Sequence, residues 1–232
     1  MTASAEALRP PALAATDLYR FYHAGDDETL ALRGVSLRLE RGEIVAVTGP
    51  SGSGKSTLLA CLAGLDEPDG GAVSCLGEPM TRRHEAERAD LRARHIGMLF
   101  QSNNLLDCLN VKQNVLFAQR VAGRLDVRAA DALLDEMGIA TRGSAAIATL
   151  SGGETARAGL AVALANDPAV VLADEPTGEL DQASADRLMA MLRARADRGA
   201  AVLLVTHNPA AAEWADREVQ MRDGRIDAEV TR

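Results

Sequence analysis

The sequence predicts an α/β fold with a mixed, mainly parallel β-sheet. Three apolar runs, at residues 44–47, 169–173 and 201–205, have the length of buried strands. Segments with a helical pattern, at residues 55–62 and 183–198, alternate with them, which is typical of a parallel sheet with helices on both faces. A hydrophobic content of 47% can fill a core, and with only 3% aromatic residues that core must consist mainly of Ala, Val and Leu.

The start of the chain is rich in Ala, Pro and Ser, so we expect a flexible tail at residues 1–17 and a folded domain at residues 18–232. The tail lacks the basic start and the long apolar core of a secretion signal. The elements expected next are strands at 37–39 and 44–47, a helix at 55–62 that ends near Gly64, and a strand at 72–75.

The middle of the chain is helical in character. The expected elements are a charged helix at 82–94, a strand at 96–100, and helices at 111–121 and 127–137. We therefore expect a helical subdomain at about residues 102–166, inserted into the core. The core then resumes with the strand at 169–173, the helix at 183–198, the strand at 201–205, and a hairpin over 219–226 with Asp223-Gly224 as its turn.

A phosphate-binding loop follows the first buried strand. The pattern G-x-x-x-x-G-K-[ST] is matched by Gly49, Pro50, Ser51, Gly52, Ser53, Gly54, Lys55, Ser56 and Thr57. Glycines let consecutive backbone N–H groups point at phosphate oxygens, and the helix that starts near Lys55 adds the positive end of its dipole. Lys55 is expected to reach the β- and γ-phosphates, and the Ser56 hydroxyl to ligate Mg²⁺. A chance Gly/Ser turn would not combine this pattern with the strand–loop–helix context.

Two acids end the strand at 169–173. Asp174, at the strand tip, suits Mg²⁺ ligation directly or through water, and Glu175 suits a base that polarises an attacking water. On its own the pattern could be a strand followed by solvated acids. Beside a phosphate loop it predicts a nucleotide-hydrolysing site.

The segment from Leu150 to Glu154 allows two interpretations. Ser151 and Glu154 have the S-x-x-E spacing of a capping box, so Ser151 could simply cap its own helix. Alternatively, Gly152 and Gly153 leave the helix N-terminus bare, so that its free N–H groups take an anion from outside while Glu154 turns back toward the cap.

A histidine follows the strand at 201–205. His207 is placed to bridge the γ-phosphate and the attacking water. The other three histidines, His23, His84 and His95, lie in polar or Arg-flanked segments, and we expect them to be solvated or structural.

Bulk properties exclude several classes of protein. A net charge of −8 argues against nucleic acid as a partner, because such binding needs a basic face. Cys61, Cys75 and Cys108 show no C-x-x-C spacing and are expected to be reduced thiols of a cytosolic protein. No apolar run approaches the roughly 20 residues that cross a bilayer. Any membrane crossing is therefore expected to come from another chain.

Together these residues resemble the ATP-binding cassette (ABC) ATPases, whose core is a P-loop NTPase fold, over nearly the whole chain. The matching elements are the phosphate loop, Gln101 after Phe100, the signature segment at 150–154, the acids Asp174 and Glu175, Asp181, and His207. The stretches at 94–101, 104–106 and 175–181 are similar to the branch of lipoprotein-releasing and macrolide-exporting ATPases and their cell-division relative. The departures are Asp107 where family members often have Pro, Glu179 in place of Asn, and Ala158-Gly159-Leu160 in place of a branched apolar run.

The resemblance implies an antiparallel N-terminal β subdomain beside the core, and further residue roles. Tyr22 would stack on adenine, although a surface tyrosine is the alternative. Gln101 would contact Mg²⁺ and sense a transporter partner. Ser151 and Gly153 would hold the γ-phosphate of ATP bound to a second copy of the chain, and Asp181 would communicate across that interface.

The function implied is that of the ATP-binding and ATP-hydrolysing subunit of an ABC transporter, with ATP and Mg²⁺ as cofactors. Its partners would be a second copy of itself, in an ATP-sandwich homodimer, and transmembrane permease subunits on a separate chain. The subunit would be cytoplasmic and peripheral on the inner face of the cell membrane, and it would energise export or extraction from the membrane. The alternative is the same ATPase in a non-transporting complex that transmits force to an extracytoplasmic partner such as a cell-wall hydrolase.

Other ATPases with the same signature fit less well. DNA-repair and chromosome ATPases carry a long coiled coil between the phosphate loop and the signature, but here Ser151 lies 96 positions after Lys55, with no sustained heptads between them. A translation factor of the superfamily would need two cassettes, and this sequence contains one.

Overall fold

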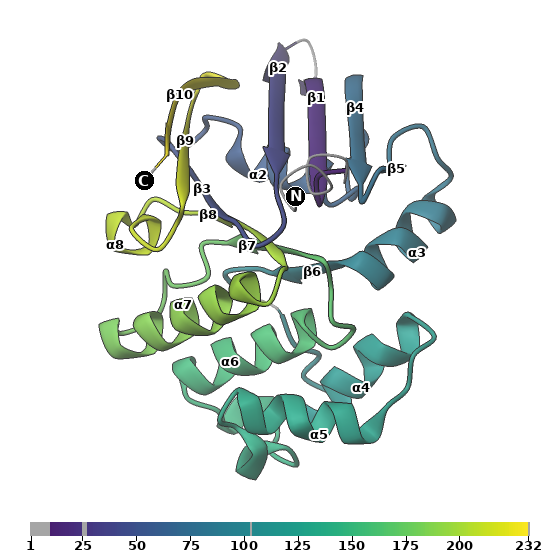
Figure 1. The fold of residues 1–232 in the computed structure, drawn as a ribbon, viewed down its shortest axis with the longest axis vertical. Helices are drawn as coiled ribbons and strands as arrows, with labels where there is room; N and C mark the ends of the chain where they lie inside the picture. The colour runs from purple at the N-terminus through teal and green to yellow at the C-terminus, as the bar shows by residue number, and fades with distance from the viewer. Residues whose placement is uncertain (1–9, 25–26, 103, 232) are drawn as a thin grey trace, which may run out of the picture.

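The computed structural model describes residues 10–24, 27–102 and 104–231, which form two sheets and a helical region. In Figure 1 the antiparallel sheet stands at the top, the larger sheet crosses the middle, and helices α4, α5 and α6 lie at the bottom. The predicted fold class, with a mixed, mainly parallel sheet, an antiparallel N-terminal β subdomain and an inserted helical subdomain, is confirmed.

The larger sheet has the strand order β10-β9-β3-β8-β7-β6. Its centre is fully buried because β3 (Ile44–Thr48), β7 (Val170–Asp174) and β8 (Ala201–Val205) are nearly continuous apolar runs, as expected of parallel strands covered on both faces. β6 (Ile96–Leu99) pairs in parallel with β7, and β9 (Arg217–Arg222) in parallel with β3. β10 (Arg225–Thr231) completes the predicted hairpin antiparallel to β9.

The carboxyl ends of β3, β7 and β8 meet at one edge of this sheet, because the three strands are parallel and in register. α2 (Lys55–Leu62) follows β3, with the predicted bounds, and α7 (Gln182–Asp197) leads from β7 toward β8. α8 (Pro209–Ala212) follows β8. The phosphate loop, the two acids and His207 therefore all lie at the edge formed by the carboxyl ends of these strands.

The smaller sheet consists of β1 (Leu13–Ala24), β2 (Asp27–Leu39), β4 (Gly70–Cys75) and β5 (Glu78–Pro79), in the order β2-β1-β4-β5. It shares an apolar core with α2 and the inner face of the larger sheet. Cys61 and Cys75 lie buried in that core as free thiols, and burial raises the pKa of the Cys61 thiol to about 12.

The helical region contains α4 (Val111–Val121), α5 (Val127–Glu136), two 3₁₀ turns (Ala140–Arg142 and Ile147–Thr149) and α6 (Gly152–Ala163). Its core is continuous with the face of the larger sheet that α7 covers. α3 (Glu85–His95) precedes β6, and its buried residue Leu91 packs in the core shared by α2 and the smaller sheet. Among the described residues, no helix has the length and apolar character that crossing a membrane requires.

The prediction of a tail at residues 1–17 is wrong for its last five residues. β1 begins at Leu13, which is fully buried and pairs with both Leu39 and Cys75. The strand is irregular, with register shifts in its pairing, and its inward positions include Leu13, Ala15 and Leu18. Residues 1–9 lie outside the described part of the chain.

Candidate active site

The phosphate loop has the backbone that the sequence pattern predicts. Gly49 has φ 142°, and a Cβ there would lie 2.1 Å from the Met221 carbonyl oxygen. Gly54 has φ 99° and directly precedes α2, and a Cβ there would lie 2.5 Å from the Ala31 carbonyl oxygen. Only glycine fits at these two positions, so the loop backbone packs closely against β9 at Met221 and β2 at Ala31.

Lys55 folds back over the loop that precedes it. Its Nζ donates to the carbonyl oxygens of Gly49 and Pro50, both at 2.8 Å. The ammonium group is therefore already held above the loop that would receive phosphate oxygens.

Asp174 ends β7 beside this loop. Burial raises the pKa of its carboxyl group, and the neighbouring Glu175 charge raises it further, whereas Lys55 and a hydrogen bond from Ser56 act in the opposite direction. Carboxylate and hydroxyl oxygens on a half-buried strand tip are the donors that Mg²⁺ prefers when phosphates and water complete its shell. Ser56 and Asp174 therefore fit a magnesium ion.

Glu175 is held in a fixed orientation at the strand tip. Its backbone has φ 47°, a left-handed conformation that is unusual for this residue type. The carboxylate accepts hydrogen bonds from Thr206 Oγ1 at 3.2 Å and from the His207 backbone N–H at 3.0 Å, and it lies 2.7 Å from His207 Nδ1. Only 15% of the Glu175 side chain is exposed, whereas 75% of the His207 side chain is. The carboxylate is anchored, and the imidazole faces the solvent.

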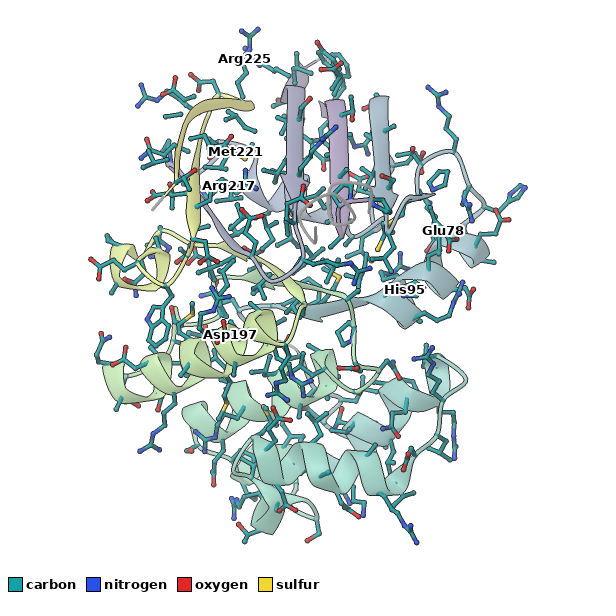
Figure 2. All side chains as sticks on the ribbon, in the orientation of Figure 1. Glu78, His95, Asp197, Arg217, Met221 and Arg225 are labelled. Atoms are coloured by element: carbon teal, nitrogen blue, oxygen red, sulfur yellow. The ribbon has the colours of Figure 1, made fainter. Side chains whose placement is uncertain are left out.

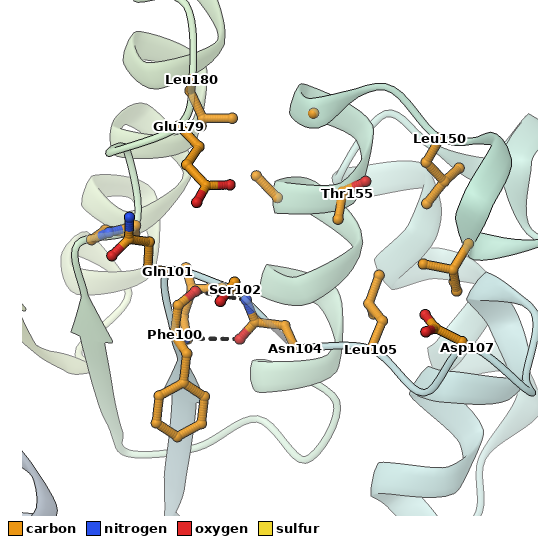
Figure 3. Close-up of a pocket in the computed structure, with 15 residues that line it drawn as sticks. Phe100, Gln101, Ser102, Asn104, Leu105, Asp107, Leu150, Thr155, Glu179 and Leu180 are labelled. Atoms are coloured by element: carbon orange, nitrogen blue, oxygen red, sulfur yellow. Dashed lines mark hydrogen bonds between the residues drawn. The ribbon is translucent and has the colours of Figure 1, made fainter.

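Gln101 connects two cavities. It lines the large cavity around the phosphate loop and a smaller one toward the helical region. Figure 3 shows the smaller cavity, where the Asn104 side chain fixes Phe100, the residue before Gln101. It accepts a hydrogen bond from Phe100 N at 2.7 Å and donates one to Phe100 O at 2.6 Å. This brace holds the backbone just before Gln101.

A single open cavity of about 750 Å³ unites most of the predicted site. Its lining includes eight of the nine residues at 49–57, together with Tyr22, Gln101, Asp174, Glu175 and His207. The Tyr22 hydroxyl donates to Asp66 Oδ2 at 2.8 Å, and the Arg20 guanidinium lies 4.8 Å from the ring centre. Tyr22 is thus held in place at the rim, although 40% of it is exposed. Ser53 is the loop residue missing from the lining, because it is buried beneath the loop.

The signature segment lies outside this cavity. Ser151, Gly153, Glu154 and Asp181 line neither it nor the smaller cavity, and Gly152 lines only the smaller one. Ser151 caps α6: its Oγ accepts from Glu154 N at 3.3 Å, and Glu154 Oε2 accepts from Ser151 N at 2.8 Å. Glu154 turns back toward the cap, as predicted, and Arg142 Nε lies 3.2 Å from its other oxygen.

The N-termini of α6 and α7 touch at Gly153. A Cβ at Gly153 would lie 2.7 Å from Ser184 Oγ. Ser184 in turn donates to Asp181 through its backbone N–H at 3.0 Å and its hydroxyl at 2.8 Å, which lowers the pKa of Asp181. Asp181 therefore caps α7 and is coupled to the signature helix through one serine.

Sequence reasoning missed several residues of the site. Thr206 orients Glu175, and its position next to His207 was the available signal. Asp66 holds Tyr22 from 44 positions away, and no local pattern indicates it. Thr29, Leu30, Ala31 and Arg33 from β2 also line the cavity, together with Asp223 from the hairpin turn.

Comparisons with known proteins place this geometry in a family. Residues 32–178 match the family model described as ABC transporter. The chain belongs to the ABC transporter family. The predictions of this family and of ATPase activity of the ABC type are thereby confirmed.

Two groups of relatives refine the comparison. The macrolide export ATP-binding/permease proteins MacB of Shigella flexneri and of Escherichia coli strain K12 are each 41% identical over 219 residues, which cover 93% of this ABC cassette and 34% of those proteins. The chain thus spans about a third of the length of the curated relatives it matches. A dimeric structure of MJ0796, a bacterial ABC transporter cassette, has a TM-score of 0.88 at 30% identity, covering 94% of this chain and 98% of that one. A second MJ0796 structure, a post-hydrolysis dimer bound to ADP and Pi, matches equally well.

Proposed function

We propose that this ABC cassette binds and hydrolyses ATP to energise a membrane permease, in export or in extraction of a substrate from the membrane. The names of the MacB relatives combine ATP binding with a permease, and this chain matches about a third of their length. The cassette would work at the inner face of the cell membrane, held there through the permease. The ATPase domain would run from β1 to the end of the chain, with the helical subdomain at about 102–166 inserted in it.

The nucleotide would lie in the cavity at the carboxyl edge of the larger sheet. Tyr22 would stack on the adenine, the amides at 49–57 would surround the phosphates, and Lys55 would leave its carbonyl partners for the β- and γ-phosphates. Ser56, Asp174 and Gln101 would hold Mg²⁺, which neutralises phosphate charge when bound.

Glu175 is the proposed general base. It would orient the attacking water and accept its proton, with His207 contacting both the water and the γ-phosphate. The observation that carries this assignment is the anchoring of the Glu175 carboxylate by Thr206 and His207 within the cavity that contains the phosphate loop. An orienting shell of this kind holds a base at one place while leaving its outer face free.

A second copy would complete the site. Ser151 and Gly153 lie outside the cavity of their own chain but belong to the N-terminus of α6, whose positive dipole end is suited to the γ-phosphate held by a partner. The dimeric MJ0796 cassette, at 30% identity, supports this arrangement. Asp181 would report closure through Ser184 and Gly153.

Replacement of the base tests the proposal. Glu175→Gln should keep ATP affinity, lose hydrolysis by a factor of about 10² or more, and accumulate an ATP-bound dimer, because the amide cannot accept the proton. The exposed Glu213, in the turn after α8, supplies the control Glu213→Gln, which should hydrolyse ATP normally. Normal turnover by Glu175→Gln would remove the assignment of the base.

A further inference from the structure

A cluster of arginines lies at the edge of the larger sheet that the ATPase site does not use. It surrounds a cavity of about 240 Å³ lined by Arg41, Arg94, His95, Arg124, Asp167, Arg195, Arg198 and neighbouring backbone. Arg41 precedes β3, His95 precedes β6, Asp167 precedes β7, and Gly199-Ala200 precede β8. The cavity is therefore at the amino ends of the parallel strands. At about 3.3 Å per residue, a five-residue strand separates it from the nucleotide by roughly 15 Å.

The charge of this cavity is opposite to that of the molecule. Five arginines and one aspartate line it, in a chain whose net charge is −8. Outside the lining, Glu136 pairs with Arg195 Nη2 at 3.0 Å and with Arg198, and Asp90 pairs with Arg94 at 2.6 Å. Asp167, which is 92% exposed, lies 3.2 Å from Arg195 Nη1. Positive charge still exceeds negative charge after these pairs are counted.

Two of the guanidinium groups have spare donors. Among the described residues, the Nε atoms of Arg94 and Arg195 are buried and have no hydrogen-bond partner. Leaving such a donor without a partner costs free energy, more so in a charged group. Arg41 and Arg124 are exposed loop residues whose guanidinium groups form no ion pair with any carboxylate in the described ranges.

Helix termini explain only part of the cluster. Arg94 and Arg195 lie in the last turns of α3 and α7, where a cation complements the negative end of the helix dipole. Arg124 lies just beyond the C-cap of α4, where its backbone N–H donates to Gln119 O at 2.8 Å, but Arg41 lies in the loop between β2 and β3. Four segments far apart in sequence thus bring their cations to one cavity, and the helix dipoles give no reason for Arg41.

We propose that this cavity binds a phosphate-bearing anion, distinct from the ATP site. Guanidinium groups match phosphate oxygens with parallel N–H donors, and a multiply charged phosphate satisfies several of them at once. The volume is below that of a cavity for a drug-sized ligand, which favours a small phosphate or a single headgroup over a nucleotide. Because the positive charge is confined to a cavity, the cluster differs from the extended basic face that binds nucleic acid.

His95 supplies an internal probe of the site. It lies at the junction of α3 and β6, labelled in Figure 2. Burial lowers the pKa of its imidazole, and the charges of Arg94 and Arg124 lower it further, whereas Glu78 and Asp90 act against them. An anion beside these arginines would favour the imidazolium and raise that pKa.

The test uses the full chain, with inorganic pyrophosphate as the probe and the His95 ring signals in NMR as the readout. Pyrophosphate should raise the pKa of His95. The double variant Arg41→Ala/Arg124→Ala should need at least roughly tenfold more pyrophosphate for the same response, because charge-assisted hydrogen bonds are lost. Arg225→Ala, on β10 and far from His95 in Figure 2, is the matched control and should respond as the parent does. ATPase activity should be the same in all three proteins.

Vesicles separate the two sources of phosphate. The protein is sedimented with phosphatidylglycerol vesicles and, for comparison, with phosphatidylcholine vesicles. If it binds only the phosphatidylglycerol vesicles, and the double variant loses this binding, the site is assigned to a lipid headgroup. A response to pyrophosphate without vesicle binding would assign it to a free phosphate. If neither probe gives a response that depends on Arg41 and Arg124, the proposed site does not exist.

Discussion

At the scale of single residues, the site depends on contacts that fix charged groups before any ligand arrives. Glu175 is the clearest case, because Thr206 and His207 occupy its carboxylate from one side. Thr206 is fully buried, and its hydroxyl also accepts from Asn208 N at 3.0 Å. This one side chain thus connects the base to the turn that carries His207.

Removal of the Thr206 hydroxyl should therefore disturb catalysis more than binding. Thr206→Val should lower kcat by about tenfold, the equivalent of the ~1–1.5 kcal/mol typical of one lost hydrogen bond, with the KM for ATP little changed. Steady-state ATPase kinetics provide the measurement. Thr206→Ser keeps the hydroxyl and should keep most of the activity; a Ser variant as slow as the Val variant would argue against the hydrogen bond.

Asp174 makes the stability of the nucleotide-free protein depend on pH. Burial raises the pKa of its carboxyl group in the folded protein above the value in the unfolded chain. As the pH rises, the unfolded chain therefore releases this proton before the folded protein does. The free energy of unfolding falls as the pH rises from the unfolded pKa through the folded pKa. Asp174→Asn should therefore raise the urea midpoint at neutral pH, with the gain shrinking in acid below the ordinary pKa of Asp. A gain that persisted unchanged in acid would have another cause.

Sequence alone predicted the residues whose roles are local in the chain. The loop at 49–57, Asp174, Glu175 and His207 each follow a buried strand, so their common location follows from parallel pairing. Asp66 and the β2 residues lining the cavity were not predicted, because their contacts join segments tens of positions apart and depend on how the two sheets pack.

At the scale of elements, helix N-termini serve two purposes. α4 and α6 both begin with a capping box, Asn110 with Gln113 and Ser151 with Glu154. The cap of α4 is the shorter, with Asn110 Oδ1 2.8 Å from Gln113 N, compared with 3.3 Å for Ser151 Oγ and Glu154 N. The structure confirms that Ser151 caps its helix, and we propose that the same hydroxyl also contacts ATP.

A comparison of these two caps separates stability from catalysis. Asn110→Ala should cost about 1 kcal/mol of unfolding free energy and leave ATPase activity of the folded protein intact. Ser151→Ala should cost no more stability but abolish most of the activity, because its hydroxyl would contact the γ-phosphate. Denaturant unfolding and ATPase assays on both variants give the result, and equal, small losses of activity in the two would show that Ser151 is a cap alone.

Element boundaries were predictable where glycine or a strand tip marks them. α2 and α4 have the expected bounds, because Gly54, Gly64 and Gly123 flank them at positive φ. β1 and most of β2 were not predicted, because their pairing contains register shifts, which break the regular alternation of a strand.

At the scale of the whole molecule, the division between cavity and signature is the central feature. One copy gathers the phosphate loop, Asp174, Glu175 and His207, but it presents Ser151 and Gly153 elsewhere. Sequence resemblance predicted this division only through the family, because no spacing in the chain indicates which helix N-terminus meets which loop. The site is therefore proposed to close between two copies related by a twofold axis.

Complementation between two inactive variants tests that claim most directly. Lys55→Ala damages the loop of its own site, and Ser151→Ala damages the site of its partner, so a mixed dimer holds one doubly damaged site and one intact site. After mixing in equal amounts, ATPase activity should rise well above that of either variant alone, up to about a quarter of the wild-type rate for random pairing in a twofold dimer. Activity in the mixture no higher than the mean of the separate variants would contradict the shared site.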